Sequence, residues 1–265
     1  MACKGHSAAE PARSGGGWTI EHQDRVGSTQ TLARGRPAWS AVVAGEQTAG
    51  RGQATRSFTS DPGGLYVTAV LPYAGDPLET RGFALAVGWA LREMLLRMGV
   101  KNLRLRWPND LMVGPRKVGG ILVEQGGSDT LLVGVGLNVT NHPWIAEPAL
   151  QPIAGRLADA VAGRALPGIR KMAEEVLQAI RKAHETFARD RLAGFAVRLN
   201  DCWGPAHEVV IEPAGGVQRA DVQGWFRGID QDGRVLVQLA EGKSVAIPAH
   251  EIGRLREVMS SSRGM

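Results

Sequence analysis

Residues 106–124 read RWPNDLMVGPRKVGGILVE and place a lysine and two nearby glycines directly before an apolar run. The run ILVE predicts a central strand, so Lys117 stands at its entrance beside Gly119 and Gly120. Because glycine carries no side chain, a ligand can lie against the backbone there while the lysine enters the same cleft. A solvated lysine in a hairpin turn is the alternative interpretation of these residues.

The first part of this segment, Arg106-Trp107-Pro108-Asn109-Asp110, predicts a turn between two short strands. Pro108 favours extended backbone at Trp107, and the Asn-Asp pair supplies turn-forming polar groups. Asp110 is placed either to orient a lysine or to lie near a metal ion. An ordinary Pro-Asn-Asp turn without chemistry also fits the sequence.

Upstream, residues 48–64 predict a long loop rich in Gly, Thr, Ser and Arg. Long loops inside compact domains are commonly functional. Gly50 and Gly52 flank Arg51, so backbone N–H groups and a guanidinium can approach the same phosphate or carboxylate. A mobile basic surface loop is the other interpretation.

Apolar periodicity predicts the remaining elements. Strands are expected at 18–23, 40–47, 65–71, 103–106, 110–113, 117–125 and 130–139. Helices are expected after Ser28, between Thr80 and Gly99 with Pro77 ahead of it, and over 169–191. Alternating glycines at 134 and 136 indicate close approach of a ligand or another backbone to the last of these strands.

The pattern of apolar residues and turn residues along the sequence divides the chain into three parts. Residues 1–17 lack an apolar region and are expected to be a disordered lead, which argues against a secretory signal. Residues 18–201 form a larger domain with mixed helices and strands. In residues 202–265, short alternating strands separated by Gly/Asp turns predict a small antiparallel barrel of SH3-like size, followed by a short tail.

Composition excludes several classes of protein. The 265 residues are 43% hydrophobic and 22% charged, and no apolar run is long enough to cross a membrane. The chain has two cysteines, one of them Cys3 in the lead, which argues against a structural disulfide and favours the cytoplasm. The net charge of +5 is spread thinly, which fits anionic small substrates better than nucleic acid.

The order of the motifs carries a resemblance to a known family. In chain order they are GST at 27–29, EQTAGRG at 46–52, GGLYVT at 63–68, RWPNDL at 106–111, RKVGGILVE at 116–124 and GVGLNVT at 134–140. This succession resembles the catalytic domain of biotin protein ligases, and GIDQDGRVLV at 228–237 resembles their small terminal barrel. The match covers residues 18–257.

The resemblance implies an α+β fold, with a mixed sheet and flanking helices of the class II synthetase-like kind, in which residues 18–201 bind biotin and ATP. Such enzymes join the biotin carboxylate to the α-phosphate of ATP, giving biotinoyl-5′-AMP, and a carrier lysine then attacks that anhydride. Cationic groups and Mg²⁺ would relieve the repulsion between the two anionic substrates.

The resemblance also assigns roles to residues. Lys117 and Arg51 match the catalytic cations. The residues that match the biotin site are Ser28, Thr29, Gln30, Gln47, Gly50, Arg51, Gly52, Gln53, Trp107, Lys117, Gly119 and Gly120. Those that match the nucleotide side are Arg51, Arg56, Asn109 and Asn138, with Asp110 as a candidate Mg²⁺ ligand.

The implied partner is a biotin carboxyl carrier protein of an acyl-CoA carboxylase, and a homodimer is possible within the family. The residues before Trp18 are too few for a winged helix, so no DNA binding is expected. Two alternatives stay open: a biotin-binding protein that has lost catalysis, and a related lipoate or octanoate transferase. Intact Lys117 and Arg51 favour the ligase over the binding protein, and the pairing of RWPND with RKVGG favours biotin.

The sequence departs from the usual family pattern at four positions. Gln53 replaces a second loop arginine, Thr55 a glycine and Phe58 a tryptophan, and Gln30 stands where asparagine usually follows Ser-Thr. Losing one arginine removes a charge-assisted phosphate contact of about 1.5–3 kcal/mol. The loop, which would act as a lid over the adenylate, is therefore expected to retain it less tightly.

Gln53→Arg should restore that contact and slow the release of biotinoyl-5′-AMP by roughly tenfold to a hundredfold. The rate can be followed by trapping the released adenylate in single-turnover experiments. An unchanged release rate would contradict the explanation given for the loop.

Overall fold

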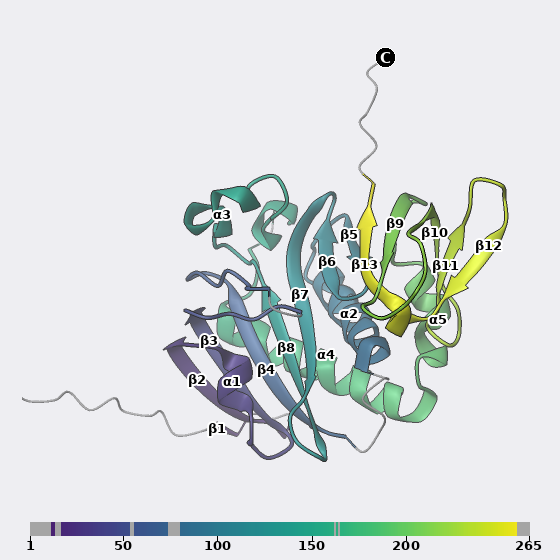
Figure 1. The fold of residues 1–265 in the computed structure, drawn as a ribbon. Helices are drawn as coiled ribbons and strands as arrows, with labels where there is room; N and C mark the ends of the chain where they lie inside the picture. The colour runs from purple at the N-terminus through teal and green to yellow at the C-terminus, as the bar shows by residue number, and fades with distance from the viewer. Residues whose placement is uncertain are drawn as a thin grey trace, which may run out of the picture.

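The structure, a computed structural model, describes residues 12–13, 17–53, 56–73, 80–161, 163 and 165–258 (Figure 1). Cys3, Thr55 and Pro77, which entered the sequence interpretation, lie outside these ranges. Within them, no helix is long and apolar enough to cross a membrane.

The larger part of the chain is built on an eight-stranded mixed sheet. Its strands, in spatial order, are β1 (Ala12–Arg13), β2 (Thr19–Val26), β3 (Ser40–Gln47), β4 (Leu65–Pro72), β8 (Thr130–Leu137), β7 (Arg116–Gln125), β6 (Asp110–Val113) and β5 (Leu103–Arg106). Strands β2 and β3 run parallel, and every other pairing is antiparallel. The expected mixed sheet is confirmed.

Helices cover the two faces of this sheet unequally (Figure 1). The helices are α1 (Thr29–Ala33), α2 (Thr80–Arg97), α3 (Pro143–Ala146), α4 (Ile169–Asp190) and α5 (Ala193–Asn200), with short 3₁₀ turns at Pro148–Leu150, Leu157–Ala160 and Ala249–Glu251. On one face, α2 and α4 pack on the main core, which includes Val43 of β3 and Val133 of β8. On the other face, α1 buries only a small cluster with Val42 and Leu132. Neighbouring strand residues point to opposite faces, so every strand also presents side chains to the face that carries α1. Since α1 covers only a small part of this face, most of it is open for a site.

The C-terminal part is a separate antiparallel sheet. Its strands are β12 (Ser244–Ile247), β11 (Val235–Gln238), β10 (Val222–Ile229), β9 (Glu208–Pro213) and β13 (Ile252–Glu257), in that spatial order. The expected antiparallel sheet is confirmed, whereas its closure into an SH3-like barrel stays a prediction. The predicted boundary after residue 201 falls between α5 and β9 and also stays a prediction.

The last strand docks the C-terminal sheet against β5 of the main sheet (Figure 1). Two guanidinium nitrogens of Arg104 donate to the two carboxylate oxygens of Glu257, at 2.8 and 2.7 Å. His207 Nε2 lies 3.3 Å from the same carboxylate. Burial by itself would raise the pKa of Glu257, but the neighbouring Arg104 and His207 outweigh it and leave that pKa below its usual value.

Glu257→Gln should therefore lower the free energy of unfolding at pH 7 by about 1–3 kcal/mol, because Arg104 loses a charge-assisted bidentate partner. A carboxyl whose pKa is depressed by folding adds stability above its unfolded pKa and loses it as the pH falls through its folded pKa. The variant and the parent protein should consequently converge in acid. Urea unfolding at a series of pH values measures the difference.

Glu212→Gln is the matched control, because Glu212 pairs with the half-exposed Arg256 on the same sheet. An exposed ion pair contributes about 0–1 kcal/mol, so its removal should have little effect. Equal effects of the two substitutions, or a Glu257→Gln effect that persists in acid, would contradict the docking role.

Candidate functional site

A cavity of about 860 Å³ lies between the α1 face of the main sheet and strand β13. Its walls come from α1, from the loop after β3, from β6 and β7, and from residues 252–257 of the C-terminal sheet. Pro152 and Ile153, from the segment after α3, line it beside Lys117. Residues far apart in the chain thus share one cavity.

Three glycines form the floor of the cavity where β7 meets β8, beside Leu122. Gly120 pairs with Gly136 and Leu122 with Gly134, so the three glycines lie on one face. The ring of Phe58 rests on this floor: a Cβ at Gly136 would lie 2.7 Å from its Cε1 atom. The glycines therefore allow a flat group to lie directly against the backbone.

A polar pocket lies at the α1 end of the floor. The side-chain oxygen Oε1 of Gln47 accepts hydrogen bonds from the backbone N–H of Thr29 at 2.8 Å and from its hydroxyl at 3.0 Å. The hydroxyl of Thr68, fully buried on β4, lies 2.9 Å from the Thr29 hydroxyl and 3.1 Å from the side-chain oxygen Oε1 of Gln30. Ser28 Oγ is buried without a hydrogen-bond partner among the described residues. Since buried polar atoms are nearly always bonded, Ser28 is suited to a polar ligand atom.

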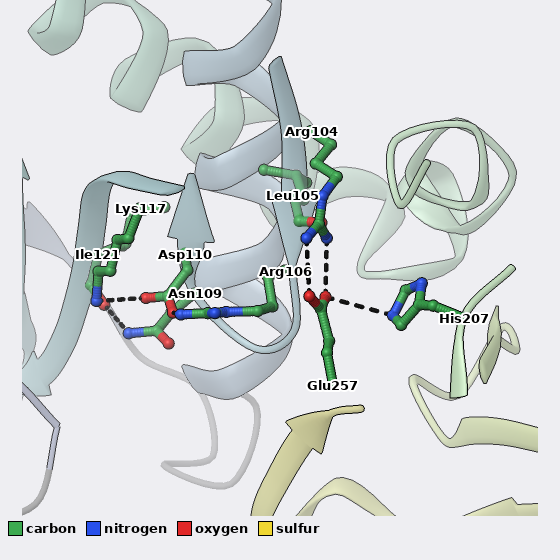
Figure 2. A network of polar contacts seen from close by, with 9 residues as sticks. All are labelled: Arg104, Leu105, Arg106, Asn109, Asp110, Lys117, Ile121, His207 and Glu257. Carbon is green, nitrogen blue, oxygen red and sulfur yellow. Dashed lines mark hydrogen bonds and ion pairs between the residues drawn. The ribbon is translucent and has the colours of Figure 1, made fainter. Parts of the chain in front are cut away.

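An ion-pair cluster lies at the other end of the floor (Figure 2). Asp110 accepts from Lys117 Nζ at 2.6 Å through one oxygen, and from Arg106 Nη2 at 2.6 Å through the other. Burial by itself would raise the pKa of Asp110, but the Lys117 ammonium and the Arg106 guanidinium outweigh it and hold that pKa below its usual value. Two cations on one carboxylate leave a net positive charge at this end.

The turn before β6 fixes Asp110 beside the floor. The Asn109 side-chain amide donates to the carbonyl oxygen of Ile121 at 2.7 Å, and the Ile121 N–H donates back to the Asn109 carbonyl at 3.0 Å. Trp107, which precedes a cis peptide bond at Pro108, is buried and lines the cavity. The turn thus does more than reverse the chain, because it clamps Asn109 to β7.

Arg51 and Lys117 line the same cavity but have separate carboxylate partners. Arg51 Nη2 donates to Glu124 at 2.9 Å, near the far end of β7 from Lys117. The ring of Phe58 lies on the floor between these ends, and its centroid is 5.8 Å from Lys117 Nζ. The two cations therefore bracket the glycine floor.

Most of the predicted site residues line the cavity in the structure, and three of them do not. Those that line it are Ser28, Thr29, Gln30, Gln47, Arg51, Gly52, Gln53, Arg56, Trp107, Asn109, Asp110, Lys117 and Gly120. Gly50 instead packs in its own loop, where a Cβ would lie 2.2 Å from the Phe58 carbonyl oxygen. Gly119 faces the helix-covered core, where a Cβ would lie 2.6 Å from Leu137, and Asn138 is buried beside Asn141.

Several contributors, Arg106 among them, were not singled out from the sequence as site residues. Thr68 is the one polar side chain besides Tyr66 in the strand LYVTAVL, and that signal was available. Glu124 ends the apolar run ILVE and could have been recognised as a charge entering a cleft. The contribution of residues 252–257 carried no local signal, because it depends on how the C-terminal sheet docks.

Gly134→Ala should break the polar pocket, because a Cβ there would lie 2.6 Å from the side-chain oxygen Oε1 of Gln30. The displaced amide would lose its buried partner Thr68, at a cost of about 1–3 kcal/mol in the free energy of unfolding. Denaturant titration measures it. Gly127→Ala is the control, since its Cβ would meet Thr130 Oγ1 at an ordinary 3.5 Å. Equal stabilities of the two variants would contradict this account.

Comparison with known proteins places the chain among enzymes with similar sequence and fold. The sequence profile of the biotin/lipoate A/B protein ligase family matches residues 22–139. A biotin--[acetyl-CoA-carboxylase] ligase from Paracoccus denitrificans is 30% identical over 234 residues, which cover 83% of this chain and 92% of that protein. The bifunctional ligase/repressor BirA of Escherichia coli is 28% identical over 230 residues, and the match spans 81% of this chain but 64% of BirA.

Solved structures extend the likeness over the C-terminal sheet. Biotin protein ligase from Aquifex aeolicus in complex with biotin and ATP superposes with a TM-score of 0.76 at 26% identity, covering 90% of this chain and 99% of that one. The apo form of the same enzyme gives a TM-score of 0.71 at 24% identity.

Proposed function

Because this chain belongs to the biotin protein ligases of the biotin/lipoate A/B protein ligase family, we propose that it activates biotin with ATP and transfers it to a carrier lysine. The single observation that carries the proposal is the cavity with a polar pocket at one end, a cation cluster at the other and between them a floor of glycines against which the flat ring of Phe58 lies. That arrangement suits a ligand with a polar head, a flat body and an anionic end.

The polar head would bind in the pocket beside α1. A cyclic urea such as that of biotin has one acceptor oxygen and two N–H donors. Ser28 has a free buried hydroxyl to offer it, and Gln47 and Thr29 already bond to each other around the same space. Because Gln47 and Thr29 already hold each other in place, little order has to be created in these two side chains when the ligand arrives.

The first reaction would join two anions. A biotin carboxylate oxygen attacks the α-phosphorus of ATP, the new O–P bond forms, and pyrophosphate leaves with the electron pair of the broken P–O bond. Lys117 and Arg106 are arranged to offset the charge that gathers on the phosphoryl oxygens. Asp110 orients the lysine and is itself kept anionic by both cations.

Magnesium would enter with the phosphates of ATP. Within the described residues, no group of three His, Cys, Asp or Glu side chains could hold a metal ion. Both oxygens of Asp110 are occupied by cations, so Asp110 could bind a metal only by releasing Lys117 or Arg106. Mg²⁺ commonly binds through substrate phosphates and few protein groups, which agrees with this donor set.

The second reaction needs no nucleophile from this chain. The amine of a carrier lysine attacks the acyl carbon of biotinoyl-5′-AMP, the amide bond forms, AMP leaves and the amine gives up a proton. The ring of Phe58 and the residues after α3 border the reaction space and would limit water there. A carboxylase carrier protein is the proposed partner. A homodimer, a cytoplasmic location and the absence of DNA binding stay predictions from the sequence.

Biotin-dependent exchange of pyrophosphate into ATP tests the proposal, with lipoate assayed alongside. The expected result is that biotin supports the exchange and lipoate does not. Binding of biotin without pyrophosphate exchange would identify a biotin-binding protein that has lost catalysis. Exchange supported by lipoate would identify lipoate as the substrate.

Lys117→Gln should lower the exchange rate by about a hundredfold to a thousandfold, because one charge-stabilising donor is lost at the phosphoryl group. Arg116→Gln is the control: it is the neighbouring cation, exposed and outside the cavity. Undiminished exchange in Lys117→Gln would refute the role of the lysine.

A further inference from the structure

Glu124 near the end of β7 accepts hydrogen bonds from three side chains. Its Oε1 accepts a hydrogen bond from Arg51 Nη2 at 2.9 Å. Its Oε2 accepts hydrogen bonds from Arg34 Nη2 at 3.3 Å and from the Gln30 side-chain amide at 3.2 Å. The carboxylate thereby joins the loop after β3 to helix α1 and to the C-cap of that helix.

Arg51 uses only part of its guanidinium in this contact. Its Nη2 bonds to Glu124, and no described residue pairs with its Nε or Nη1. A guanidinium can bind two anions at once, one on each edge, because its five N–H groups point outward in a plane. Arg51 lines the cavity, so a ligand anion can reach the remaining donors while Glu124 keeps the first.

Arg34 offsets the repulsion that Glu124 would otherwise exert on such an anion. Its side chain is 45% exposed and lies outside the cavity lining. With both guanidinium groups on one carboxylate, the cluster carries a net positive charge. Arg34 thus contributes charge without touching the ligand space.

Gln30 ties the cluster to the polar pocket. Its amide nitrogen donates to Glu124, and its carbonyl oxygen lies 3.1 Å from the Thr68 hydroxyl. The side chain crosses β8 at Gly134, where any larger residue would collide with it. The glutamine that departs from the family pattern therefore spans from the pocket to Glu124.

We propose that Glu124 is a positioning residue that holds Arg51 at the cavity edge, ready for the phosphate of a nucleotidyl ligand. The identity of the ligand rests on the proposed function, whereas the positioning of Arg51 does not. Without Glu124, the Arg51 side chain, already 42% exposed, would lose the partner that keeps it at the cavity. Ligand binding would then have to order it.

The position of Arg51 can be tested without any ligand by limited trypsin digestion of the full-length protein. In Glu124→Gln, the initial cleavage rate after Arg51, relative to that after Arg56, should rise by about threefold to tenfold. Arg56 is an internal reference, because its guanidinium contacts only the Gln53 carbonyl among the described residues. Arg34→Gln should leave the ratio unchanged, and Glu124→Asp, which keeps the charge on a shorter side chain, should give an intermediate ratio.

The functional consequence is measured with biotin and ATP. Release of biotinoyl-5′-AMP from Glu124→Gln should be about threefold to tenfold faster than from the parent protein. The effect of Arg34→Gln should be smaller. An unchanged cleavage ratio or an unchanged release rate in Glu124→Gln would overturn the positioning role. If the parent protein shows no biotin-dependent exchange, the proposed function fails, and the cleavage ratio still decides the position of Arg51.

Discussion

The site depends on the pairing of β7 with β8, which sets three glycines on the open face of the sheet while apolar residues fill the other face. This pairing gives a surface on which a flat group can lie, as the ring of Phe58 does. Each end of β7 then carries two cations on one carboxylate: Lys117 and Arg106 on Asp110, and Arg51 and Arg34 on Glu124. Positive charge is thus supplied on both sides of an apolar platform, and neither carboxylate is left unpaired.

Much of this could be predicted from the sequence, because the motifs lie in order on neighbouring strands. Lys117 beside glycines before an apolar run predicted a cationic cleft, and the two are found together. The period of a strand also explains where the prediction was too coarse: adjacent residues point to opposite faces, so Gly120 and Gly119 cannot both form the floor. Gly119 instead makes room for Leu137 in the core.

What the sequence could not supply were contacts between distant segments. Arg104 and Glu257 are 153 residues apart, and nothing local to either residue indicates the other. The same holds for Gln30 and Glu124, 94 residues apart. Thr68 differs, since one polar residue within a buried apolar strand is a local sign that something polar lies opposite it.

The wall formed by β13 has a consequence for protein synthesis. Ribosomes deliver the sheet, the glycines and both cation clusters long before residues 252–257 leave the exit tunnel, and domains generally fold in that order. A nascent chain consequently displays its ligand platform with one side uncovered. Completion of the cavity therefore waits for residues 252–257, which are synthesised after every other wall of the site, and an extension fused closely behind Glu257 would lie next to the cavity.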